Sequence, residues 1–73
     1  MTRLPVVSGR DLIRALRKVG FELDRQKGSH AILFRAEPPT TVTVPDHREL
    51  DRGTLRAILR QAGVTPDELA GML

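Results

Sequence analysis

The chain has 73 residues, of which 40% are hydrophobic and 29% are charged, and it contains no cysteine. A chain of this length is expected to form a single domain, residues 1–73, because it cannot bury enough surface for two cores. This composition excludes an unfolded chain, disulfides and thiolate metal sites, and the longest apolar run, residues 31–34, is far shorter than the roughly 20 residues of a transmembrane helix. The N-terminal residues do not resemble a secretory signal, so we expect a cytoplasmic protein.

Positive charge is concentrated in the first half of the chain. Twelve basic and nine acidic side chains give a formal net charge of +3. Residues 1–36 hold eight basic and three acidic side chains, whereas residues 37–73 hold four and six. This distribution favours an acidic partner such as a nucleic acid, and the alternative is a solvated surface that has no ligand.

A helix is predicted from Ser8 to Gly20. Ser8 and Asp11 have the spacing of a capping pair at its start, and Gly20 suits the left-handed residue that ends a helix. Its apolar residues recur at helical spacing, and its cations fall on the remaining surface. These cations are Arg10, Arg14, Arg17 and Lys18.

Three strands are predicted after this helix. Residues 21–25 alternate in polarity, which predicts a strand with Phe21 and Leu23 turned toward the core. A turn over residues 26–29 leads to a second strand, 30–35, in which apolar residues occur on both sides, so the pattern leaves its buried face open. The two prolines at positions 38 and 39 predict a loop over 36–40, and a third strand follows at 41–44.

Two more helices are predicted at the end of the chain. One begins near residues 51–54 and ends at Gly63, with an apolar stripe on one side and a ridge of three arginines on the other. The other is short and has Thr65 as its cap and Pro66 at its first position. The order α-β-β-β-α with a short C-terminal helix predicts an α+β fold, with a three-stranded antiparallel sheet and helices on one face. The ridge consists of Arg52, Arg56 and Arg60.

The segment from Lys27 to His30 is the candidate site. Gly28 lets the backbone approach a ligand, Lys27 supplies positive charge, and a histidine can exchange a proton near neutral pH. This combination suits cleavage at an RNA phosphate, in which the histidine takes the proton of the 2′-hydroxyl or gives one to the leaving 5′-oxygen. From spacing alone, an ordinary turn before a structural histidine is the more common explanation of such a segment.

Other kinds of site are not indicated. No two glycines have G-x-G spacing and no Walker lysine motif is present, so no nucleotide cofactor is expected. We expect His47, next to Asp46, to be an exposed loop histidine rather than a metal ligand. Tyrosine and tryptophan are absent, and both Phe21 and Phe34 are expected in the core, so RNA contacts are expected to be directed mostly at phosphates.

Several segments taken together resemble the HicA family. They are residues 4–5, 8–12, 16–21, 25–30 and 53–63, and their Gly-Phe, Gly-Ser-His and Gly-Thr-Leu motifs keep the order and spacing of the family. The resemblance implies a double-stranded-RNA-binding-like fold and a toxin that cleaves mRNA and is neutralised by a HicB antitoxin encoded beside it. It places the catalytic histidine at His30, with Gly28 and Ser29 as motif neighbours. The chain departs from the family pattern at Ala31 and at residues 46–48.

The sequence therefore predicts a metal-independent endoribonuclease that needs no cofactor, with His30 as general acid or base. Its RNA-binding residues are predicted to be Arg25, Lys27, Gly28 and Ser29. The second proton-transfer group is left open between water, Lys27 and another group. One alternative is a non-catalytic module that binds double-stranded RNA, in which His30 is only structural. Another is a module that binds only a protein.

Overall fold

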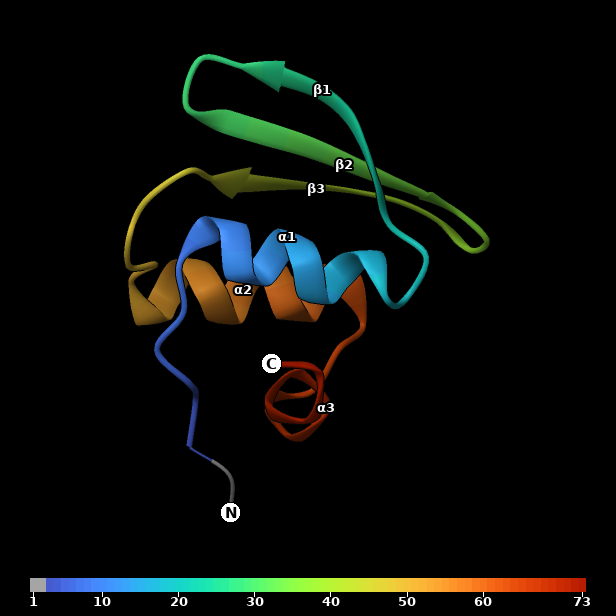
Figure 1. Cartoon of the computed structure of the whole chain (residues 1–73). Coiled ribbons are helices and arrows are strands. Elements are labelled where there is room, and N and C mark those ends of the chain that lie inside the picture. The colour runs from blue at the N-terminus through green and yellow to red at the C-terminus, as the bar shows by residue number, and fades with distance from the viewer. Residues whose placement is uncertain (1–2) are drawn as a thin grey trace.

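The elements of the chain follow the predicted order. The computed structural model describes residues 3–73, and within them three helices and three strands succeed one another as α1-β1-β2-β3-α2-α3 (Figure 1). The strands form one antiparallel sheet in the order β1-β2-β3. The α+β prediction is thus confirmed. The elements are α1 Gly9–Arg17, β1 Glu22–Lys27, β2 His30–Ala36, β3 Pro39–Pro45, α2 Arg52–Ala62 and α3 Pro66–Met72.

The helices begin at the predicted capping residues. The Ser8 hydroxyl accepts a hydrogen bond from the Asp11 N–H over 3.0 Å, and the Asp11 carboxylate accepts one from the Ser8 N–H over 3.2 Å. Thr65 forms the equivalent reciprocal box at the start of α3. Gly63 ends α2 with φ of 73°, as predicted. Gly20 does not itself end α1, which stops at Arg17 and is followed by a turn containing this glycine.

The two hairpin turns are shorter than predicted. The β1–β2 turn consists of residues 28–29, rather than 26–29, and the β2–β3 turn of residues 37–38, rather than 36–40. Strand pairing therefore extends almost to the turns and includes Pro39. A proline is tolerated there because it is the first residue of β3, which is an edge strand.

One face of the sheet is covered by helices, and the other is open. Figure 1 shows α1 and α2 on the same side of the sheet, with α3 below them in this view. Because successive side chains of a strand point to opposite faces, the burial of alternate residues identifies the covered side. His30, Ile32 and Phe34 of β2 consequently lie on the open face, which resolves the choice that the sequence pattern left open. The buried strand side chains are Ala31, Leu33, Val42 and Val44.

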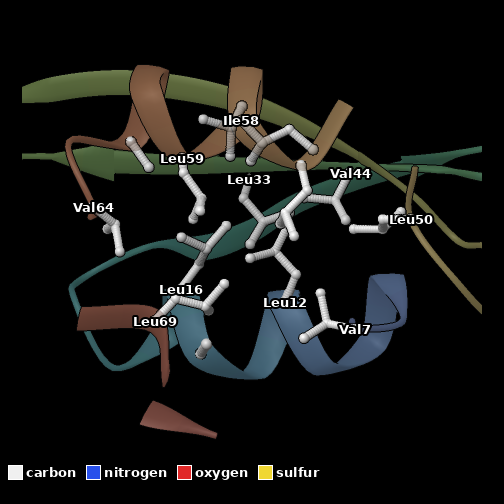
Figure 2. Close-up of a cluster of buried hydrophobic side chains, with 14 of the residues drawn as sticks. Val7, Leu12, Leu16, Leu33, Val44, Leu50, Ile58, Leu59, Val64 and Leu69 are labelled. Atoms are coloured by element: carbon white, nitrogen blue, oxygen red, sulfur yellow. The ribbon is translucent and has the colours of Figure 1, made fainter. Parts of the chain in front are cut away.

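Aliphatic side chains from the sheet and the three helices form the core. Leu12 and Leu16 of α1, Leu33 of β2 and Leu69 of α3 belong to one buried cluster (Figure 2). Leu69 is fully buried, so the short final helix is part of the core. Within residues 3–73 no polar or charged side chain is buried, so packing of apolar groups accounts for the interior.

Two apolar residues are more exposed than predicted. Leu23 is 46% exposed, because β1 is an edge strand and the helices make their principal contacts with β3. Phe34 is 44% exposed on the open face, so the prediction that both phenylalanines lie in the core is correct only for Phe21. In the described part of the chain, no helix is long and apolar enough to cross a membrane.

Candidate functional site

His30 is the first residue of β2 and directly follows the turn formed by Gly28 and Ser29. Gly28 has φ of 60°, and a Cβ built on it would meet no atom within 4 Å. Backbone conformation, rather than lack of space, therefore favours glycine at this position. The turn places His30 opposite Lys27 of β1, and on its other side His30 pairs with Pro45 of β3.

Two cations share the open face with His30. Directly opposed residues in an antiparallel pair project from the same face, and Lys27 lies opposite His30 while Arg25 lies opposite Ile32. Both cations are exposed. Within residues 3–73 neither of them forms an ion pair or a side-chain hydrogen bond. Arg25 and Lys27 are therefore free to contact an anionic ligand beside the histidine.

The His30 side chain is itself accessible. It is exposed, and in the part of the chain that the structure describes it takes part in no hydrogen bond. A histidine that supports a fold is normally buried and hydrogen-bonded, because a buried polar group without a partner is costly. His30 thus makes no side-chain hydrogen bond that would have to break before its imidazole could contact a ligand.

The start of α1 and the loop after β3 close this end of the sheet. The Asp46 N–H donates a hydrogen bond of 2.6 Å to the carbonyl of Ser29, and the Gly9 N–H donates one of 2.8 Å to the carbonyl of His47. A Cβ on Gly9 would overlap the carbonyl oxygen of Pro45. The backbone of the candidate turn is therefore tied to the β3–α2 loop, and that loop is tied to α1.

A depression of about 370 Å³ lies at the same end and is lined by residues of α1, its cap and the β3–α2 loop. Two of its lining residues form an ion pair, in which Arg10 Nε lies 3.5 Å from Asp46 Oδ1. His47 is an exposed loop residue, as predicted, and among residues 3–73 no cluster of three or more His, Asp or Glu side chains is placed to hold a metal. The lining residues are Ser8, Arg10, Asp46, His47 and Arg48.

The arginine ridge of α2 is separate from His30. Arg52, Arg56 and Arg60 are exposed, as predicted. They belong to α2, which covers the face of the sheet opposite to the open face (Figure 1). The structure therefore brings Arg25 and Lys27 to His30 but does not bring the ridge to it.

Two further side chains share the open face with His30, and the sequence pattern did not show that this face of the strand is the open one. Ile32 is half-buried and Phe34 is partly exposed, and both lie in line with His30 along β2. The alternation of residues 30, 32 and 34 was visible in the sequence. It was not decisive, because the intervening positions are also partly apolar.

Comparison with known proteins supplies one finding. A family model described as HicA toxin of bacterial toxin-antitoxin matches residues 9–64. The matched region is more than half of the chain and contains the candidate site and every element except α3. No curated protein matches the chain by sequence.

Proposed function

Because the chain belongs to the HicA toxin family, we propose that it is a toxin that acts as a metal-independent endoribonuclease on mRNA. Family membership supports the role of toxin in a toxin-antitoxin pair. One observation supports RNA cleavage: an exposed imidazole, at His30, lies opposite an unpaired lysine and next to a glycine turn. A base or acid, a cation and an approachable backbone are the groups that cleavage of a phosphodiester needs.

In the proposed reaction, the ribose 2′-oxygen attacks the adjacent phosphorus while its proton passes to a base. The bond from phosphorus to the 5′-oxygen breaks, and the leaving oxygen takes a proton from an acid. His30 serves one of these two transfers, and water, Lys27 or another group serves the other. Lys27 and Arg25 stabilise the negative charge that develops on the phosphate oxygens. The products are a 2′,3′-cyclic phosphate and a 5′-hydroxyl.

The turn before His30 contributes by its shape. Gly28 presents backbone without a side chain, so a phosphate can approach closely. The Ser29 hydroxyl is exposed and forms no hydrogen bond within residues 3–73, which leaves it free to orient the substrate. The Ser29 carbonyl accepts a hydrogen bond from the Asp46 N–H, and this contact fixes the backbone directly before His30.

The partner that we propose is a HicB-type antitoxin that covers His30 in the cytoplasm. Arg25 and Lys27 favour acidic or polar antitoxin groups at this surface, because complementary charge promotes association. Antitoxin and mRNA would then compete for one face. A purified complex that suppresses cleavage while His30 stays accessible would contradict this arrangement.

The test of the nuclease activity uses the purified full chain and a defined single-stranded RNA in excess chelator. We expect cleavage, with a 2′,3′-cyclic phosphate and a 5′-hydroxyl at the new ends. His30→Gln protein purified in the same way is the control for a contaminating nuclease. RNA that is bound but remains intact would identify a binding module instead. Cleavage that requires added divalent cations would contradict the metal-independent reaction.

A further inference from the structure

The open face of the sheet carries an aromatic ring in line with His30. Phe34 is on the same strand and the same face, and 44% of it is exposed. Side chains on one face of a strand are spaced by two residues, so Phe34 lies about 13 Å from His30 along β2. Most large apolar side chains of the chain are buried, and Phe34 is one of four large hydrophobic residues that are exposed among residues 3–73.

The strand register defines what surrounds this ring. In the row of His30, Lys27 is the neighbour on β1, and in the row of Ile32 it is Arg25. In the row of Phe34, β1 supplies Glu22 instead. Among the residues paired with β2, β1 thus supplies two unpaired cations at the His30 end and a carboxylate beside the aromatic end, while Asp24, at the bulge between Leu23 and Arg25, has no partner on β2. On β3, the residues opposite Ile32 and Phe34 are Thr43 and Thr41.

This combination matches the chemistry of single-stranded RNA. Unpaired bases stack on aromatic side chains, and their phosphates contact cations. A phosphate beside Lys27 and Arg25 would be attracted, whereas one beside Glu22 would be repelled. The charges therefore place the RNA backbone at the His30 end and leave a base to contact Phe34. Duplex RNA would not use the ring in this way, because its bases are stacked within the helix.

We propose that the open sheet face binds single-stranded RNA and that Phe34 stacks on a base near the scissile phosphate. The inference rests on the proposed nuclease function and extends it to a substrate class and a binding residue. The stacked base belongs to a neighbouring nucleotide, because Phe34 lies two side-chain rows away from His30. Phe34 is thus a binding residue and takes no part in proton transfer.

The binding test compares Phe34→Leu with Leu23→Ala, both in a His30→Gln chain that does not consume its ligand. Leu23 is a matched control, because it is equally exposed but lies opposite Leu33, a residue of the covered face. The probes are a fluorescent single-stranded RNA of mixed sequence and a hairpin duplex. Phe34→Leu should weaken binding of the single strand about 10-fold, because leucine has no π-face for a base. Leu23→Ala should leave binding of the single strand unchanged. Neither substitution should change binding of the duplex.

The cleavage test uses the same substitutions with His30 intact. Phe34→Leu should lower kcat/KM for single-stranded RNA about 10-fold, and Phe34→Trp should retain it, since indole also stacks. Melting temperatures show whether each variant is folded. A folded Phe34→Leu protein that binds and cuts like the parent would overturn the inference and leave the nuclease intact. The inference would also be overturned if Phe34→Leu weakened binding to the antitoxin but not to RNA, since the ring would then belong to the antitoxin interface. If the parent chain never cuts RNA, but Phe34→Leu still weakens its binding to single-stranded RNA, only the nuclease function would be refuted.

Discussion

Gly9→Ala is expected to unfold the chain at a much lower temperature, because this glycine is where α1 meets the end of β3. A Cβ on Gly9 would overlap the Pro45 carbonyl oxygen and lie 3.2 Å from the Asp46 Cα. All of these atoms are backbone, so no side chain can rotate away. The start of α1 would have to move, and the hydrogen bond from the Gly9 N–H to the His47 carbonyl would be lost or lengthened.

The magnitude follows from these two contacts. Overpacking against a rigid neighbour costs about 1–3 kcal/mol, and loss of the hydrogen bond costs about 1 kcal/mol more. Replacing glycine by alanine at the first helical position returns less than about 1 kcal/mol. The net loss is therefore about 1–4 kcal/mol of the free energy of unfolding. In a domain of this size that corresponds to a fall in Tm of about 5–30 °C.

Thermal unfolding followed by circular dichroism measures this effect, with Gly71→Ala as the control. Gly71 is exposed near the end of α3, and a Cβ there would meet no atom within 4 Å. That substitution should leave Tm unchanged or raise it slightly, because alanine restricts the unfolded chain. A Gly9→Ala protein that melts at the parent temperature would refute the contact between α1 and β3.

Three further predictions concern the ridge, Arg35 and the helix caps. Arg56→Glu with Arg60→Glu should leave the salt dependence of single-stranded RNA binding unchanged, because α2 covers the face of the sheet opposite to that of His30. Arg25→Ala with Lys27→Ala should instead reduce the slope of this salt dependence by about 0.7 for each lost phosphate contact. Arg35→Lys should lower the free energy of unfolding, measured in urea titrations, by about 1–3 kcal/mol. Arg35 donates hydrogen bonds to the Ala62 carbonyl over 3.1 Å and to the Thr40 hydroxyl over 3.0 Å, and its guanidinium lies 4.6 Å from the Phe21 ring centroid. Unchanged stability would contradict these contacts. The hydroxyl and then the backbone N–H of Thr54 hold the pKa of Asp51 below its ordinary 3.8, and the backbone N–H and then the hydroxyl of Thr65 hold the pKa of Glu68 below 4.5. A carboxyl group whose pKa is lowered in the folded state stabilises the protein at pH values above its ordinary pKa, and this stabilisation is lost as the pH falls through the folded-state pKa. Asp51→Asn with Glu68→Gln should therefore lose less stability than the parent below about pH 4. Equal losses would contradict the caps.

Local interactions made much of the fold predictable from the sequence. Ser8 and Asp11 lie three residues apart, as do Thr65 and Glu68, and a cap depends only on residues within one helical turn. A turn at Gly28 likewise follows from a glycine between two strand patterns, but its length of two residues, rather than the predicted four, does not. Once that turn has two residues, the pairing of Lys27 with His30 follows from the geometry of a hairpin.

The remaining features depend on contacts between distant residues. The exposure of Phe34 follows from which face of β2 the helices cover, and both faces of this strand are partly apolar. The tie between Gly9 and His47 joins residues far apart in the chain, and no local pattern encodes it. Packing of α1 and α2 on one face of the sheet decides the first, and the contact of α1 with the end of β3 decides the second, so neither could be predicted from neighbouring residues.

The most direct test of the account is the single-turnover rate at which His30→Gln cuts a defined RNA in chelator. Loss of a general acid or base lowers the rate about 10²- to 10⁴-fold. Because His30 is exposed and makes no side-chain hydrogen bond within residues 3–73, Tm and RNA affinity measured on the same preparation should stay close to those of the parent. We therefore predict a folded protein that binds RNA and scarcely cuts it. A folded His30→Gln protein that cuts at the parent rate would contradict the catalytic role of this histidine.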